Sequence, residues 1–279
     1  MIFNTIVIIH YACIVWSMYT YKKLMGEVKH LARAGVETGV IGQSVQRREI
    51  PYIFAGDKRG ACVFITAGIH AREHIGCYLV MRQVYRALNH AAQITPLGGI
   101  YFLPMLNPDG NELARCCCPL YKANANRVDL NVNFDADWGT GKQNVFAPAD
   151  ENYVGTHPFS EPETRALRDF TLLHKPAATV SYHAIGRELY WDFGQSGASR
   201  ARDEKLALHL NKVLHYTIIP FTKTSAGGYK DWCIQKLNIP SFTIELVSPE
   251  HPHPFTHYAL AADDIKRNLD LPARLLQAL

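Results

Sequence analysis

Two residues three positions apart, His70 and Glu73, stand just after a strand predicted over 62–67, where the chain turns into a helix. At such a turn their side chains can face the same way, so an imidazole nitrogen and a carboxylate oxygen can reach one zinc ion at about 2.0 to 2.2 Å. His183 follows a strand predicted over 178–182, and loops at the carboxyl edge of an α/β sheet gather ligands. Three protein ligands leave a fourth position for water, which is typical of a catalytic zinc. We therefore expect one zinc ion per chain, held by His70, Glu73 and His183.

A catalytic zinc site also needs a base. Glu245 is flanked by apolar residues in the stretch FTIEL at 242–246, and a carboxylate is costly to bury unless it has a role. A raised pKa would suit Glu245 to take a proton from zinc-bound water, so it is the expected general base. The alternative is that Glu245 faces solvent from an edge strand. Asp129, in the polar segment 127–131, is expected to orient a liganding imidazole through its other ring nitrogen.

The metal assignment has competing interpretations. The chain has 13 histidines, so a His-x-x-Glu pair can arise by chance. His74 also stands next to Glu73, but one step along a helix turns a side chain by about 100°, away from the face of Glu73. We therefore expect His74 to be an ordinary histidine at the start of a helix.

Helical stretches alternate with short apolar runs, a pattern typical of an α/β sheet with helices packed on its faces. Strands are predicted at 50–55, 62–67, 100–106, 178–182, 217–222 and 241–247, and helices at 22–34, 75–91, 161–173, 200–214, 229–237 and 259–279. Pro272 is expected to break or kink the last helix. The stretch 107–160 is rich in Asn, Gly, Pro and Asp, and a loop of that size is usually functional, so we expect it to cover one side of the active site.

Composition narrows the class of protein. A chain of 279 residues with 48% hydrophobic and 19% charged residues can form one large core, so a single catalytic domain is expected over 19–279. The 29 Lys and Arg residues nearly balance the 25 Asp and Glu residues, and no basic run occurs, which argues against nucleic acid as a partner. The seven cysteines include a contiguous triplet at 116–118 and form no CxxC pair. Reduced thiols in a cytoplasm fit this pattern better than a disulfide framework or a thiolate zinc finger.

The first 18 residues form an apolar leader whose role stays open. A signal peptide begins with basic residues, but this stretch has no Lys or Arg. A membrane span needs about 20 apolar residues, but Asn4, His10 and Ser17 interrupt this stretch. It is an unneeded or wrongly started leader, a membrane anchor, or a buried strand. Any membrane association is expected only through these residues.

Five motifs in order along the chain resemble those of the zinc carboxypeptidase family, over a match from about Tyr19 to the C-terminus. They are GIHARE at 68–73, NPDG at 107–110, VDLN at 128–131, SYH at 181–183 and FTIE at 242–245. The resemblance implies a mixed, mainly parallel eight-stranded sheet flanked by helices. It also implies the same three ligands, Asp129 as their hydrogen-bonding partner and Glu245 as the base. Arg72 would face the substrate.

Three positions depart from the family pattern. Val132 replaces the Arg that follows Asn131 in the family and that clamps the substrate's C-terminal carboxylate, although Asn131 itself is kept as a substrate contact. Lys122 stands where the family has an Arg that polarises the scissile carbonyl, and a Lys can still stabilise an oxyanion as a point charge. The family tyrosine before the Gly-Gly turn aligns with Lys223, for which Tyr229 is a partial substitute.

Within the family the chain looks most like the bacterial γ-D-glutamyl-meso-diaminopimelate peptidases, which cut peptidoglycan stem peptides. This likeness rests on DLNVNF at 129–134, WGTG at 138–141, PFSE at 158–161 and SAGGYKDW at 225–232. HAIG at 183–186 departs from the His-Ser-Lys-Gly expected there. Lys230, after the Gly-Gly turn, suits the extra carboxylate of a diamino diacid, unless it is a solvated helix residue. A general metallocarboxypeptidase, an N-acyl amino acid deacylase of the aspartoacylase type and a non-catalytic binding domain stay open as alternatives.

Overall fold

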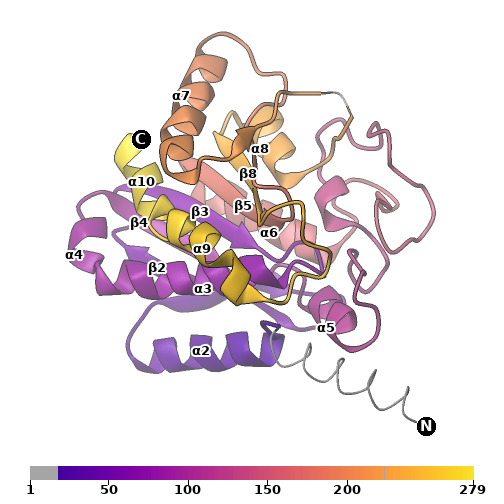
Figure 1. Ribbon diagram of the computed structural model, residues 1–279, viewed down its shortest axis with the longest axis horizontal. Coiled ribbons are helices and arrows are strands. Elements are labelled where there is room, and N and C mark those ends of the chain that lie inside the picture. Colours follow the sequence, from indigo (N-terminus) through magenta and orange to yellow (C-terminus); the bar gives the residue numbers. More distant parts are fainter. Residues whose placement is uncertain (1–17, 223) are drawn as a thin grey trace.

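The computed structural model describes residues 18–222 and 224–279 and contains one eight-stranded sheet (Figure 1). The strand order is β1-β2-β4-β3-β5-β8-β6-β7. The strands are β1 (Thr38–Gln43), β2 (Glu49–Gly56), β3 (Ala61–Ala67), β4 (Gly98–Leu103), β5 (Ala178–Ala184), β6 (Glu188–Tyr190), β7 (Thr217–Ile218) and β8 (Ser241–Leu246). The central strands β4, β3, β5 and β8 run parallel, whereas β1, β2 and β6 join through antiparallel pairs. The predicted mixed, mainly parallel sheet is thus confirmed.

Helices cover both faces of this sheet, so that it forms the middle layer of three. They are α2 (Tyr21–Arg33), α3 (His74–Asn89), α4 (Ala91–Ile94), α5 (Pro108–Cys116), α6 (Pro162–His174), α7 (Gly197–Leu214), α8 (Tyr229–Leu237), α9 (Ala262–Asn268) and α10 (Leu271–Ala278). Buried side chains of α2, α3, α7 and α10 pack on one face, and those of α6 and α8 on the other (Figure 1). Along β3, Val63 and Ile65 join the first core and Phe64 the second, as the two-residue period of a strand requires.

The sequence did not predict two of the strands, β1 and β6. β1 is an edge strand with the sequence TGVIGQ, in which no residue is fully buried, and β6 has three residues. β1 pairs with the next strand, β2, and β6 pairs with the distant strand β8, and local composition reveals neither pairing. The strand predicted over 217–222 is also shorter than expected and ends at Ile218, two residues before Pro220, which has no backbone N–H to donate to a sheet.

The helix predicted over 259–279 is divided into a 3-10 turn, Tyr258–Ala261, and the helices α9 and α10. Pro272 lies in the first turn of α10, just after the break, where its missing N–H costs nothing. The predicted loop over 107–160 contains α5 and a 3-10 turn at Leu130–Val132, so it is not without regular structure.

Within the described residues, no helix has the length and apolar character needed to cross a bilayer. The apolar leader predicted over 1–18 lies outside the described residues except for Met18, which is buried.

Candidate metal and catalytic site

Three adjacent parallel strands carry the predicted ligands and base to one edge of the sheet. β3 ends at Ala67 and leads into the turn that carries His70 and Glu73, and α3 begins at the next residue. His183 lies inside β5 rather than after it, because this strand extends to Ala184. It pairs in register with Glu245 of β8. The carboxyl ends of parallel strands meet at one edge, which explains why residues so distant in sequence converge there.

His70, Glu73 and His183 place their ligating atoms within 4.8 Å of one another, and they form the one such group among the described residues. His70 Nδ1 lies 2.8 Å from Glu73 Oε1, and His183 Nδ1 lies 3.2 Å from Glu73 Oε2. The two Nδ1 atoms are 3.1 Å apart. All three side chains are buried.

This arrangement fits a zinc ion. Two imidazole nitrogens facing each other leave at most one proton between them, and a cation bound to both removes the lone-pair repulsion. Burial raises the pKa of Glu73, but the neighbouring His70 and His183 outweigh it and hold that pKa well below its usual range. An ionised carboxylate with two imidazoles is a donor set that zinc accepts in catalytic sites, with the fourth position left for water.

Asp129 lies next to the metal group and contacts both His70 and Lys122. Its fully buried carboxylate lies 3.3 Å from His70 Nε2 and 3.0 Å from Lys122 Nζ, and it accepts hydrogen bonds from the backbone N–H groups of Asn131 and Asn152. Burial would raise the pKa of Asp129, but Lys122 and His70 lower it well below the usual range. The two backbone hydrogen bonds fix the carboxylate, which in turn lies within ion-pair distance of both the His70 ring and the Lys122 ammonium.

Glu245 lies on β8, which is flanked by β5 and β6 and is therefore not an edge strand. The alternative of a solvent-facing edge-strand residue is thus wrong. Burial raises the pKa of Glu245 to about 8, with His183 opposing the shift and Glu73 adding to it. A divalent cation at the neighbouring ligands would lower that pKa and favour the basic carboxylate form.

A cavity of about 340 Å³ opens from this group and gives a substrate room beside it. Its wall includes His70, His183, Lys122, Asn131 and Glu245, all of which the sequence predicted as site residues. Residues that the sequence analysis missed also line it, namely Tyr190, Asp192, Phe193, Phe221, Thr224, Ser225, Asp231 and Thr243. They come from β6, β8, α8 and the segments between them, so no local motif groups them.

Lys230 lies at this cavity and is largely buried, so the alternative of a solvated helix residue is not supported. Its Nζ donates to Asp231 Oδ1 at 2.5 Å and to the backbone oxygen of Asp192 at 3.2 Å. The ammonium also stands 5.3 Å from the ring centre of Phe193. Among the described residues two of its three N–H bonds have partners, which leaves one for a ligand in the cavity.

Two further predicted contacts lie elsewhere. Tyr229 is fully buried and its hydroxyl pairs with Thr171 at 2.9 Å, so the structure does not support a contact of its side chain with substrate. Lys223, for which it was to substitute, lies outside the described residues. Arg72 is not among the residues that line the cavity. Its Nη1 donates instead to the backbone oxygen of Leu120 at 2.9 Å.

His74 behaves as the sequence predicted. It is fully buried at the start of α3, outside the metal group, and its Nδ1 lies 2.7 Å from Asn111 Nδ2. Burial lowers the pKa of His74 to about 4, so the ring is neutral and serves the packing between α3 and α5.

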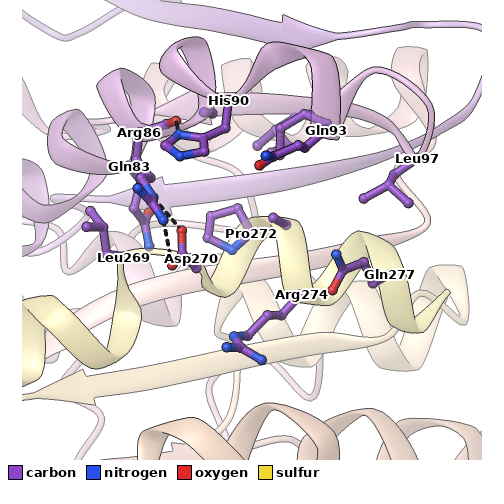
Figure 2. Close-up of a pocket in the computed structure, with 14 residues that line it drawn as sticks. Gln83, Arg86, His90, Gln93, Leu97, Leu269, Asp270, Pro272, Arg274 and Gln277 are labelled. Carbon is purple, nitrogen blue, oxygen red and sulfur yellow. Dashed lines mark hydrogen bonds and ion pairs between the residues drawn. The ribbon is translucent and has the colours of Figure 1, made fainter.

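A second cavity, of about 250 Å³, lies between α3, α4 and α10 (Figure 2). Arg86 and Asp270 form an ion pair at its edge, with Nε to Oδ1 at 2.6 Å, and His90, Gln93 and Pro272 face the hollow (Figure 2). It shares no residue with the metal group or with the cavity that contains Glu245, so it is not the catalytic site.

Comparison with known proteins agrees with this geometry. The profile of the family described as zinc carboxypeptidase matches residues 21–270. The chain is 30% identical over 276 residues to the γ-D-glutamyl-L-diamino acid endopeptidase 1 of Lysinibacillus sphaericus, covering 86% of this chain and 68% of that protein. It is also 30% identical to human carboxypeptidase B, covering 76% of this chain but only 58% of that enzyme.

Solved structures show the same fold. Carboxypeptidase A from Helicoverpa armigera superposes with a TM-score of 0.79 at 19% identity, covering 94% of this chain and 72% of that one. Murein-tripeptide amidase MpaA from Escherichia coli O157 superposes with a TM-score of 0.57 at 23% identity, covering 84% and 91%.

Proposed function

Because the chain belongs to the zinc carboxypeptidase family and is a zinc metallopeptidase, we propose that it hydrolyses peptidoglycan stem peptides between γ-D-Glu and meso-diaminopimelate. One zinc ion per chain would be held by His70, Glu73 and His183. The observation that carries the choice of substrate is the Lys230 ammonium, which keeps one N–H bond for a ligand at the substrate cavity.

Meso-diaminopimelate differs from an ordinary C-terminal residue by a carboxylate and an ammonium at the far end of its side chain. Lys230 supplies a charge-assisted donor for that carboxylate, and Asp231 lies beside it as an acceptor for the ammonium. The relative from Lysinibacillus sphaericus, whose name specifies a γ-D-glutamyl-L-diamino acid bond, supports the same class of substrate.

Val132 is the second residue that supports this choice of substrate. It is buried where the family has an arginine, and no arginine lines the described part of the cavity. Lys122 and Lys230 are its cationic side chains. Without a guanidinium fork, selection for a single free C-terminal residue loses its bidentate contact, so longer or differently charged leaving groups are accepted.

In the proposed reaction Glu245 takes the proton from the attacking water and passes it to the departing amine. Lys122, held by Asp129, lies at the cavity wall and stabilises negative charge on the scissile carbonyl oxygen. Zinc, when bound, polarises the carbonyl and lowers the pKa of the water beside it.

The test compares hydrolysis of L-Ala-γ-D-Glu-meso-diaminopimelate with that of a blocked dipeptide ending in Phe or Leu, with products identified by mass. We expect faster cleavage of the tripeptide, at the γ-D-Glu bond, and much slower cleavage by Glu245→Gln. Faster release from the blocked dipeptide would indicate a general metallocarboxypeptidase instead. Activity on an N-acyl amino acid alone would indicate a deacylase.

A further inference from the structure

The cavity of about 250 Å³ between α3, α4 and α10 has two chemically different ends (Figure 2). Gln83, Arg86 and Asp270 stand together at one end, and Leu97 stands at the other (Figure 2). Arg86 forms an ion pair with Asp270, and Gln83 precedes Arg86 by three residues on α3, so that these two side chains are neighbours on one helix face. A molecule in this cavity therefore meets charged and polar groups at one end and an apolar side chain at the other.

Gln83 has a buried acceptor without a partner. The residue is only 1% exposed, and its Nε2 donates to the backbone oxygen of Asn268 at 2.7 Å and to the Tyr182 hydroxyl at 2.8 Å. Because a backbone oxygen can only accept, the amide of Gln83 must turn its nitrogen towards Asn268. The remaining atom, Oε1, has no hydrogen-bond partner among the described residues. A buried carbonyl oxygen without a donor is costly, so a donor group on a ligand in this cavity would be stabilised by it.

Arg86 has donors that its ion pair does not use. Its Nε lies 2.6 Å from Asp270 Oδ1 and its Nη2 lies 3.2 Å from Asp270 Oδ2. The N–H bonds of Nη1 have no partner within the described part of the chain, and the Asp270 carboxylate keeps further lone pairs. The pair thus offers donors for a carboxylate and acceptors for an ammonium next to each other.

Apolar side chains line the cavity beyond this pair. Ile94 and Pro272 are buried and Leu97 is partly buried. The polar Gln93 and Gln277 also line the cavity, but both are exposed to solvent. An apolar group that leaves water to lie against Leu97 is stabilised by the hydrophobic effect, whereas a polar group of the same shape is not.

We propose that this cavity binds a free α-amino acid with an apolar side chain. Such a molecule has a carboxylate, an ammonium and a side chain on one carbon atom, which matches the groups that line the cavity. The carboxylate accepts from Arg86 Nη1, and the ammonium donates to Gln83 Oε1 and to Asp270. The side chain lies against Leu97. Because the cavity shares no residue with the metal group or the catalytic cavity, this site is independent of zinc and of which peptide the enzyme cleaves.

The experiment compares L-leucine with three analogues that each lack one feature, by titration calorimetry on the zinc-loaded wild-type chain. L-leucinamide lacks the carboxylate, 4-methylpentanoate lacks the ammonium, and L-asparagine has a polar side chain of nearly the same shape. We expect L-leucine to bind and each analogue to bind about 10- to 100-fold more weakly. No binding of L-leucine, or equal binding of L-leucine and the analogues, would overturn the proposal.

The same titration after removal of the zinc by a chelator shows where L-leucine binds. The Kd should stay unchanged, because no residue of the cavity belongs to the metal group. A Kd that rises when zinc is removed would place the amino acid at the metal group and would also overturn the proposal.

Arg86→Met should bind L-leucine as weakly as the wild type binds L-leucinamide. The matched control is Arg82→Met, an exposed position of the same helix that does not line the cavity, and it should keep the wild-type Kd. Wild-type affinity in Arg86→Met, or an equal loss in Arg82→Met, would contradict the site. If Arg86→Met fails to fold, the comparison of ligands on the wild type and its independence of zinc still decide the outcome.

Discussion

His183 and Glu245 are paired in register on the neighbouring parallel strands β5 and β8. Adjacent strands lie about 4.8 Å apart, so the third proposed metal ligand and the proposed base are neighbours held by the same backbone ladder. The two side chains nevertheless have different tasks. Replacing each one alone should therefore give different results.

His183→Ala is expected to cause severe loss of bound zinc, because two remaining ligands cannot hold the metal tightly. Elemental analysis of the purified variant measures this directly. The exposed His30 of α2 offers a control, and His30→Ala should keep one zinc ion per chain. Wild-type zinc content in His183→Ala would refute the ligand assignment.

Glu245→Gln is expected to keep the metal and the fold but to lower kcat by about 10²- to 10⁴-fold, because a carboxamide cannot accept the proton. Steady-state kinetics and zinc content are measured on the same preparation. Glu188, which pairs with Glu245 from the other neighbouring strand, β6, provides the control Glu188→Gln, which should lose far less activity. Near-normal turnover in Glu245→Gln would mean that another carboxylate is the base.

Asp129→Asn is expected to weaken zinc binding by about 10- to 100-fold, because the amide no longer fixes the His70 ring and the Lys122 ammonium through charge. Competition with a chelator gives the Kd for zinc. Asp150, an exposed carboxylate paired with Arg127 on the same long loop, provides the control Asp150→Asn. An unchanged zinc affinity in Asp129→Asn would show that the contact to His70 is incidental.

Lys230→Met is expected to lower kcat/KM for the meso-diaminopimelate tripeptide by about 10- to 100-fold, through loss of a charge-assisted hydrogen bond to the distal carboxylate. The counterpart ending in L-Lys lacks that carboxylate and should be affected little. Lys236→Met, an exposed substitution on the same helix, serves as the control. An equal loss for both tripeptides would mean that Lys230 only shapes the cavity.

Glu163 is expected to make stability depend on pH. Its buried carboxylate accepts from the backbone N–H of Val45 and from Asn124 Nδ2, each at 3.1 Å, and burial raises its pKa from 4.5 to about 7. An acid whose pKa is higher in the folded state binds its proton more tightly there. This stabilising effect is complete below the unfolded pKa and is lost as pH rises through about 7, by roughly 1 to 3 kcal/mol.

Glu163→Gln imitates the protonated acid and should flatten this dependence between about pH 5 and pH 8, as measured by urea unfolding. Glu204→Gln, at an exposed position of α7, should keep the wild-type profile. An unchanged pH profile in Glu163→Gln would assign the dependence to other groups.

Local signals in the sequence were sufficient for several parts of the molecule. The helix predicted over 229–237 has the bounds of α8, and the turn after β3 carries His70 and Glu73 as expected. The direction in which a side chain points could not be predicted from the sequence in the same way. Tyr229 and Lys230 are consecutive on α8, yet one is in the core and the other at the cavity, because the packing of α8 decides which side of its first turn faces inward.

The sequence by itself determined the chemistry of the site, because the types of the ligands and the turn geometry of His70 and Glu73 follow from adjacent residues. Tertiary structure decided which distant residues join them. His70 and His183 are 113 positions apart, and they meet only because β3 and β5 are neighbours in a sheet whose strand order no local pattern states. Contacts between residues so far apart in sequence form only in the complete fold, because many elements together stabilise the packing that brings these residues together.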